Sequence, residues 1–127
     1  MAEVHITGGG KIIGDAIAAL TVWSASAPRG EDLTVESASP FQVAARAIYD
    51  FLGGAEEAAE SVDGFDFMYG RALVNALDMA LWNFMSHSDI APPTGAQLAS
   101  TAAMASGHLA RALKEIQVAT SPEVQHA

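Results

Sequence analysis

The stretch FMYGRALVNALDMALWNFM, residues 67–85, decides how this chain folds. Placed at 100° per residue, its larger apolar residues share one broad side of a helix. That side consists of Leu73, Leu77, Ala80, Leu81 and Phe84. Since an apolar side of this kind is normally buried against other elements, we expect a core-packing helix over about 66–86, with Asp66 as its N-cap.

The opposite side of the same helix is mixed in character. Its polar residues stand among large apolar ones, in a group made up of Met68, Arg71, Asn75, Asp78, Met79 and Trp82. Large apolar residues on an exposed face are typical of a contact surface, which makes these six residues predicted partner-binding residues. The alternative is a central helix that is buried all round, in which the polar side chains pair internally. The sequence leaves both interpretations open.

Apolar spacing predicts further helices on both sides of this stretch. We expect one over about 11–26, one from an N-cap at Ser39 to Gly53, a brief polar helix within 55–62, and a last one that begins with the Thr94 and Gln97 capping-box pattern. The alternating runs EVHIT (3–7) and LTVES (33–37) are candidate short strands. The fold class we expect is mainly α: a compact bundle of about four main helices, with one or two short strands optional in the first 40 residues. Residues 1–120 form a single domain in this prediction, and 121–127 a frayed tail.

Composition narrows the function classes. The chain has 127 residues, 50% of them hydrophobic, and a formal net charge of -9 that arises from six basic residues against 15 acidic ones. So few bases argue against nucleic-acid binding. The absence of cysteine excludes disulfides and thiolate metal sites. Because no signal-like or membrane-spanning run is evident, we expect a cytoplasmic protein without membrane association.

The glycine-rich stretch HITGGGKIIGDAI, residues 5–17, has the order of a phosphate-binding loop but not its required residues. A Walker A loop needs glycine where His5 stands and serine or threonine where Ile12 stands, and a dinucleotide fingerprint needs a small residue at Ile13. We therefore expect a flexible turn between a strand and a helix, and no cofactor. A backbone-bound anion near Lys11 is the alternative.

No metal site or catalytic set is specified. The four histidines stand far apart in sequence, and SHSD (86–89) is interpreted as a helix end at which His87 suits the helix dipole. Glu56 and Glu60 lie on one side of a helical turn, near further acids at 57, 63 and 66. A solvated acidic face is the preferred interpretation, and a site for a hard cation or a basic partner is the alternative.

Two functional hypotheses follow. The preferred one is a non-enzymatic protein-protein interaction module, such as a self-associating regulator, an inhibitor or an adaptor, whose partner is another protein or its own copy. The alternative is a small-molecule binding or catalytic domain with a pocket between alanine-rich helices, to which Arg71, Asp78 and His108 contribute the polar groups.

Overall fold

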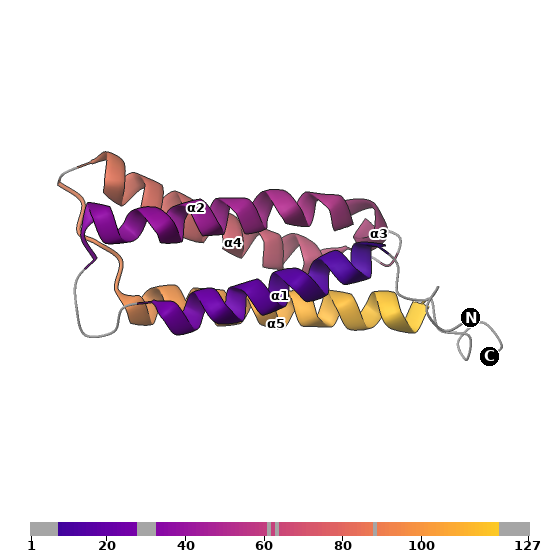
Figure 1. Cartoon of the computed structure of the whole chain (residues 1–127). Coiled ribbons are helices and arrows are strands. Elements are labelled where there is room, and N and C mark those ends of the chain that lie inside the picture. Colours follow the sequence, from indigo (N-terminus) through magenta and orange to yellow (C-terminus); the bar gives the residue numbers. More distant parts are fainter. Residues whose placement is uncertain (1–7, 28–32, 61, 63, 88, 120–127) are drawn as a thin grey trace.

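The computed structural model describes residues 8–27, 33–60, 62, 64–87 and 89–119. Within these ranges the chain is helical and contains no strand, which confirms the expected helical bundle. The four long helices are α1 (Gly8–Ser26), α2 (Val35–Leu52), α4 (Phe65–Ser86) and α5 (Gly95–Ala119). A short 3₁₀ turn, η2 (Gly53–Ala55), and the brief helix α3 (Glu56–Glu60) connect α2 to α4, as Figure 1 shows.

The long helices form an up-and-down four-helix bundle in which sequence neighbours run antiparallel (Figure 1). Helix α4 packs against α2 and α5, and α1 packs against the same two helices. Helices α1 and α4 are therefore diagonal to each other. Each has one side turned towards the core and one side turned away from it, so the outer face of α4 lies across the bundle from α1.

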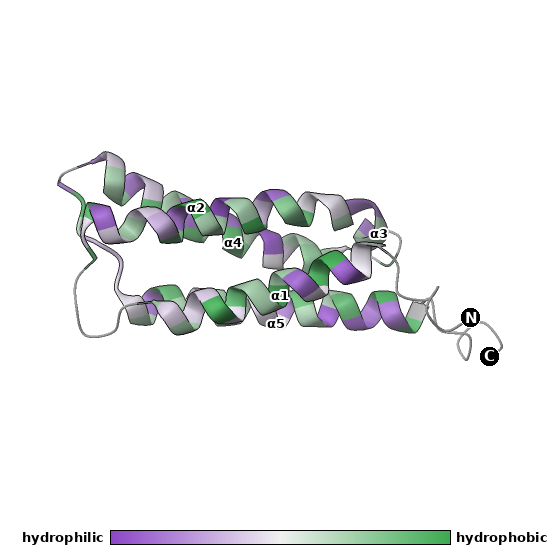
Figure 2. Cartoon of the chain, viewed as in Figure 1, coloured by the Kyte–Doolittle hydropathy of each residue, from purple (hydrophilic) through white to green (hydrophobic). Residues whose placement is uncertain are grey.

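The core is built from leucine, isoleucine and many alanines, while polar and apolar residues alternate along the outside of the long helices (Figure 2). Gly70 shows why small residues are needed. A Cβ atom at this position would lie 2.7 Å from Cγ of Leu109 and 3.2 Å from the carbonyl oxygen of Ala105. The missing side chain thus allows α4 and α5 to pack closely.

The start of α2 differs from the sequence-based expectation. Residues 33–37 do not form a strand, and Ser39 is not the N-cap, because Thr34 begins the helix one turn earlier. Its side chain accepts a hydrogen bond from the backbone N–H of Ser37, whose hydroxyl accepts one from the backbone N–H of Thr34. This reciprocal pair is a capping box. Pro40 consequently lies inside the helix.

The glycine stretch and the start of α4 also need correction. Gly8, Gly9 and Gly10 belong to the first turn of α1 rather than to a flexible turn, because Gly9 and Gly10 are buried in the bundle. Gly64, with φ of 79°, is the N-cap of α4, so Asp66 lies in the first turn and is not the cap.

Other expectations about helix ends are confirmed. The backbone N–H of Thr94 donates to Oε1 of Gln97, and that of Gln97 donates to Oγ1 of Thr94, which is the expected capping box. The brief polar helix is α3. The candidate strand 3–7 and the tail 121–127 lie outside the described residues. Among the described helices, none combines the length and apolar character that a membrane crossing requires.

Candidate functional site

Three of the six predicted partner-binding residues are large apolar side chains on the outside of α4. Met68 is 61% exposed, Met79 44% and Trp82 51%. In the described part of the chain, no other element covers them to the degree expected of core residues. The exposure of these three residues is what the contact-surface interpretation requires.

Asp78 lies elsewhere, and the prediction that it shares the exposed side is wrong. It is only 2% exposed, because α2 packs over this side of α4. Its Oδ1 atom accepts a hydrogen bond of 2.7 Å from Nε2 of Gln42, and its Oδ2 atom lies 3.7 Å from Nη1 of Arg46. Asp78 is thus a buried, paired carboxylate between two helices and does not face a partner.

Arg71 and Asn75 are half-buried. Nε of Arg71 donates to the carbonyl oxygen of Tyr49 at 3.1 Å, and the guanidinium carbon lies 4.2 Å from the centroid of the Tyr49 ring. This cation–π contact fixes Arg71 against α2. Each of the two interpretations of the mixed side therefore holds for some residues: Arg71 and Asp78 pair internally, and the large apolar residues stay outside.

Several residues of α4 are exposed outside any regular strip, namely Tyr69, Ala76, Ala80, Asn83 and Ser86. Five other exposed residues and the half-buried Asn75 follow a regular spacing that the sequence-based selection of six captured only in part. Separated by three, four, three, four and three positions, they form a strip that we call the α4 seam: Phe65, Met68, Ala72, Asn75, Met79 and Trp82. Phe65 is 53% exposed and Ala72 is also exposed. Alternation of three and four is the spacing by which one helix packs along another.

The α4 seam carries no charged residue. The charged residues of α4 are Asp66, Arg71 and Asp78, and each pairs inside the chain. An uncharged strip about five turns long is unusual on the outside of a chain with a net charge of -9.

A cavity of about 420 Å³ lies beside the first half of the seam, where α2, α3 and α4 meet. Phe65, Met68, Ala72 and Asn75 line it from α4. Its other walls include Tyr49, Glu56, Glu60 and Arg71. The seam is therefore hollowed along its first half, while Met79 and Trp82 in its second half do not line this cavity.

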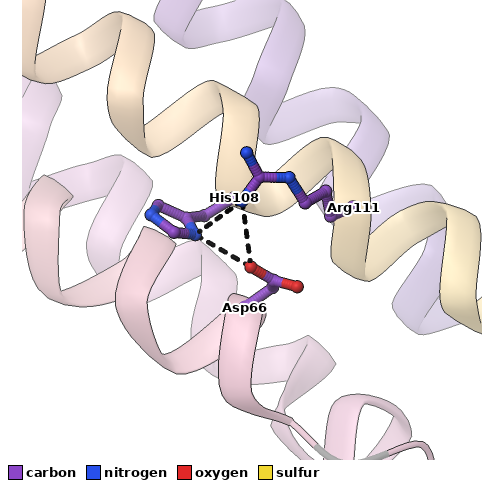
Figure 3. A network of polar contacts seen from close by, with 3 residues as sticks. All are labelled: Asp66, His108 and Arg111. Carbon is purple, nitrogen blue, oxygen red and sulfur yellow. Dashed lines mark hydrogen bonds and ion pairs between the residues drawn. The ribbon is translucent and has the colours of Figure 1, made fainter.

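A polar network links the start of α4 to α5 on another side of the bundle (Figure 3). Nδ1 of His108 lies 2.9 Å from Oδ1 of Asp66, and Nη1 of Arg111 lies 3.4 Å from the same oxygen. The His108 ring also stacks on Tyr69, with 5.6 Å between centroids. Local sequence patterns do not indicate this network, because Asp66 and His108 are 42 residues apart in the chain.

The network lowers the pKa of the Asp66 carboxyl below its ordinary value of 3.8, first through the hydrogen bond with His108 and further through the nearby Arg111. Because the pKa of Asp66 is lower in the folded than in the unfolded state, its ionised carboxylate stabilises the protein at pH values above the ordinary pKa. This stabilisation disappears as the pH falls through the pKa of the folded state.

We therefore expect Asp66→Asn to lower the free energy of unfolding at pH 7 by about 1 kcal/mol or less, because the pair is partly exposed. Measured by urea unfolding, the difference from the unmodified chain should shrink as pH falls from about 5 towards 2. A stability difference between the two chains that stays constant from pH 5 to pH 2 would contradict a lowered pKa for Asp66.

The structure does not bring together the residues expected to form a small-molecule pocket, nor the acidic residues expected to form one cluster. Arg71 lines the cavity, Asp78 is buried below the surface and His108 belongs to the network with Asp66, so the pocket expected from these three residues is absent. The expected acidic group also divides, since Glu56 and Glu60 border the cavity while Asp66 pairs with α5. Among the described residues, no group of histidine and acidic side chains could hold a metal ion.

The fold and surface together define a small four-helix bundle with an uncharged, apolar seam on one outer helix. Comparisons of the chain with family models, with curated proteins and with solved structures find no match.

Proposed function

We propose that this protein is a non-enzymatic protein-protein interaction module that binds its partner through the α4 seam. The observation that carries the proposal is the exposure of Met68, Met79 and Trp82 on the outer face of α4. Leaving large apolar side chains in water forgoes about 1.5 to 3 kcal/mol for each that could be fully buried. Their concentration on one strip therefore favours a partner that covers them.

The spacing of the seam supports a helical partner. Side chains that alternate every three and four positions fit into the gaps of a facing helix. Tryptophan, here Trp82, is also enriched among the residues that dominate binding energy at interfaces. Self-association, a role as regulator, inhibitor or adaptor, and a cytoplasmic location are further parts of this proposal.

A ligand pocket is the second candidate function, and the cavity beside the seam favours it. Its volume of about 420 Å³ lies in the range of small-molecule sites. We nevertheless assign the cavity to the protein partner, because four residues of the seam line it. A partner covering the seam would cover the cavity as well.

A photo-cross-linking experiment tests the proposed function. A benzophenone amino acid placed at Met79 should form a covalent adduct with another protein chain in the cells that make this protein. The matched control places it at Val22, which is 67% exposed on the diagonal helix α1. The adduct at position 79 should be lost when Trp82→Ala is added. Equal adducts at positions 22 and 79, or none at 79, would contradict the proposal.

A further inference from the structure

We infer that the cavity beside the α4 seam also binds a small zwitterion, meaning a molecule that carries a carboxylate and an ammonium group on one apolar body. Arg71 binds the carboxylate in this assignment, and Glu56 and Glu60 bind the ammonium group. The inference goes beyond the proposed function, because such a ligand binds to one chain and needs no protein partner.

Arg71 supplies the positive charge, and its guanidinium is held in place by α2 and η2. Nε of Arg71 donates to the carbonyl oxygen of Tyr49, and the guanidinium carbon lies 4.2 Å from the centroid of the Tyr49 ring. A Cβ atom at Gly53 would lie 3.1 Å from Nη2 of Arg71, so the glycine leaves room for the guanidinium. The Nη1 and Nη2 atoms form no hydrogen bond with a described residue and keep their N–H donors for another acceptor.

Arg71 differs from the other arginines of the described residues in having no carboxylate partner. Nη1 of Arg111 lies 3.4 Å from Asp66, and Nε of Arg46 lies 3.7 Å from Asp50. No carboxylate in the described part of the chain forms an ion pair with Arg71. A guanidinium of fixed orientation binds a carboxylate well, because it can donate two parallel hydrogen bonds to it. Arg71 is thus suited to a carboxylate that comes from a ligand.

Glu56 and Glu60 supply the negative charge. They lie one turn apart on α3, so their side chains share a face of the helix, and both line the cavity. Neither forms an ion pair with a basic group of the described residues. Carboxylates bind an ammonium group through charge-assisted hydrogen bonds. Both signs of charge therefore line one cavity without pairing with each other.

The mixture of charges decides which class of ligand fits. A simple anion would be attracted by Arg71 but repelled by Glu56 and Glu60 and by the net charge of -9. A simple cation would be attracted by the two glutamates but repelled by Arg71. A zwitterion meets attraction at both of its ends, so the cavity favours it over either kind of ion.

The remaining lining sets the body of the ligand. Phe65, Phe67 and Met68 line the same cavity and are suited to a hydrocarbon side chain. The volume of about 420 Å³ lies in the range of small-molecule sites. Apolar α-amino acids and dipeptides of apolar residues share this chemistry, and they differ in the separation of their charged ends.

A titration followed by NMR tests the inference. L-Leucine and leucyl-leucine are added separately to the chain, each up to about 10 mM, which detects dissociation constants in the millimolar range. At least one of them should shift the methyl signal of Met68, which lines the cavity, and leave that of Met104 on α5 in place. The compound with the lower dissociation constant identifies the source as a free amino acid or a dipeptide. No shift of Met68 with either compound overturns the inference.

Blocking either end of the ligand tests the charge requirement. Acetylation removes the ammonium group and amidation removes the carboxylate. Each change should raise the dissociation constant at least about tenfold, because a charged hydrogen-bonding group is lost. Blocked compounds that bind as tightly as the unblocked one would overturn the assignment to a zwitterion.

Variants of the cavity connect each end of the ligand to its residue. Glu56→Gln combined with Glu60→Gln should weaken binding about tenfold and remove the penalty for acetylation, whereas Arg71→Gln should remove the penalty for amidation. The matched control is Glu57→Gln, since Glu57 is exposed on α3 but does not line the cavity. It should bind the ligand like the unmodified chain.

Circular dichroism checks that each variant folds. Glu56 and Glu60 are exposed, so their variant keeps the test decisive even if Arg71→Gln fails to fold. Unchanged binding in the glutamate variant overturns the inference. The cross-link at position 79 is measured without any ligand, so this result leaves the proposed function standing.

Discussion

Replacing Gln42 by leucine is expected to lower the free energy of unfolding by about 2 to 3 kcal/mol, although the two side chains have similar volumes. Nε2 of Gln42 donates the 2.7 Å hydrogen bond to the buried carboxylate of Asp78. Without this donor the carboxylate keeps only Arg46, at 3.7 Å from its other oxygen. A buried charge that loses its hydrogen bond is costly, because water cannot replace the donor.

The double variant Gln42→Leu with Asp78→Val should regain most of this loss. With both partners apolar, no buried charge remains between α2 and α4, since Arg46 is largely exposed, and replacing a buried polar pair by apolar residues is often close to neutral. Urea unfolding of the two single variants and the double variant gives the coupling energy directly. Additive losses, or an unchanged midpoint for Gln42→Leu, would contradict the pairing.

Replacing Trp82 by alanine is expected to weaken dimerisation by about 2 kcal/mol, which is about 30-fold in the dissociation constant. Trp82 is 51% exposed within the chain, so about half of its surface is free to contact the proposed partner. The urea midpoint of the monomer should change little for the same reason. Sedimentation equilibrium gives the dissociation constant, and dilute urea unfolding gives the midpoint.

Val22→Ala on α1 is the matched control, since Val22 is also a large apolar residue and is more exposed than Trp82. It should leave both quantities unchanged. A large fall in the monomer midpoint of Trp82→Ala would instead assign Trp82 to the core. An unchanged dissociation constant would remove Trp82 from the interface.

The helices could be predicted from sequence because their signals are local. Apolar residues such as Ile13 and Leu20, or Leu98 and Leu109, recur at helical spacing and are buried in the structure. Helix starts were less predictable, because several capping patterns compete. Thr34 with Ser37 overrides the pattern at Ser39, although both are plausible from sequence.

The site was only partly predictable, because burial depends on which helix packs where. On a helical wheel Asp78 falls in the polar sector, yet Gln42 on α2 lies within hydrogen-bond distance of it. Asp66 resembles an N-cap, but its partner is His108, far along the chain. Such long-range pairs leave no periodic signal in one sequence.

The seam was present in the sequence but was selected only in part. Phe65 was missed because it precedes the stretch 67–85, and Ala72 because only polar and large apolar side chains were selected on that side. Their exposure in the structure then places them with Trp82 on one strip.

Methionine methyl NMR tests the central claim, that the α4 seam is where this protein contacts its own copy. The chain has five methionines; Met68 and Met79 lie in the seam, Met85 is half-buried and Met104 is exposed on α5. On dilution from about 500 to about 10 µM, a range in which weak self-association is detected, the methyl signals of Met68 and Met79 should shift together while that of Met85 stays in place. Signals of Met68 and Met79 that do not move over this range, or movement of Met104 without them, would contradict the claim.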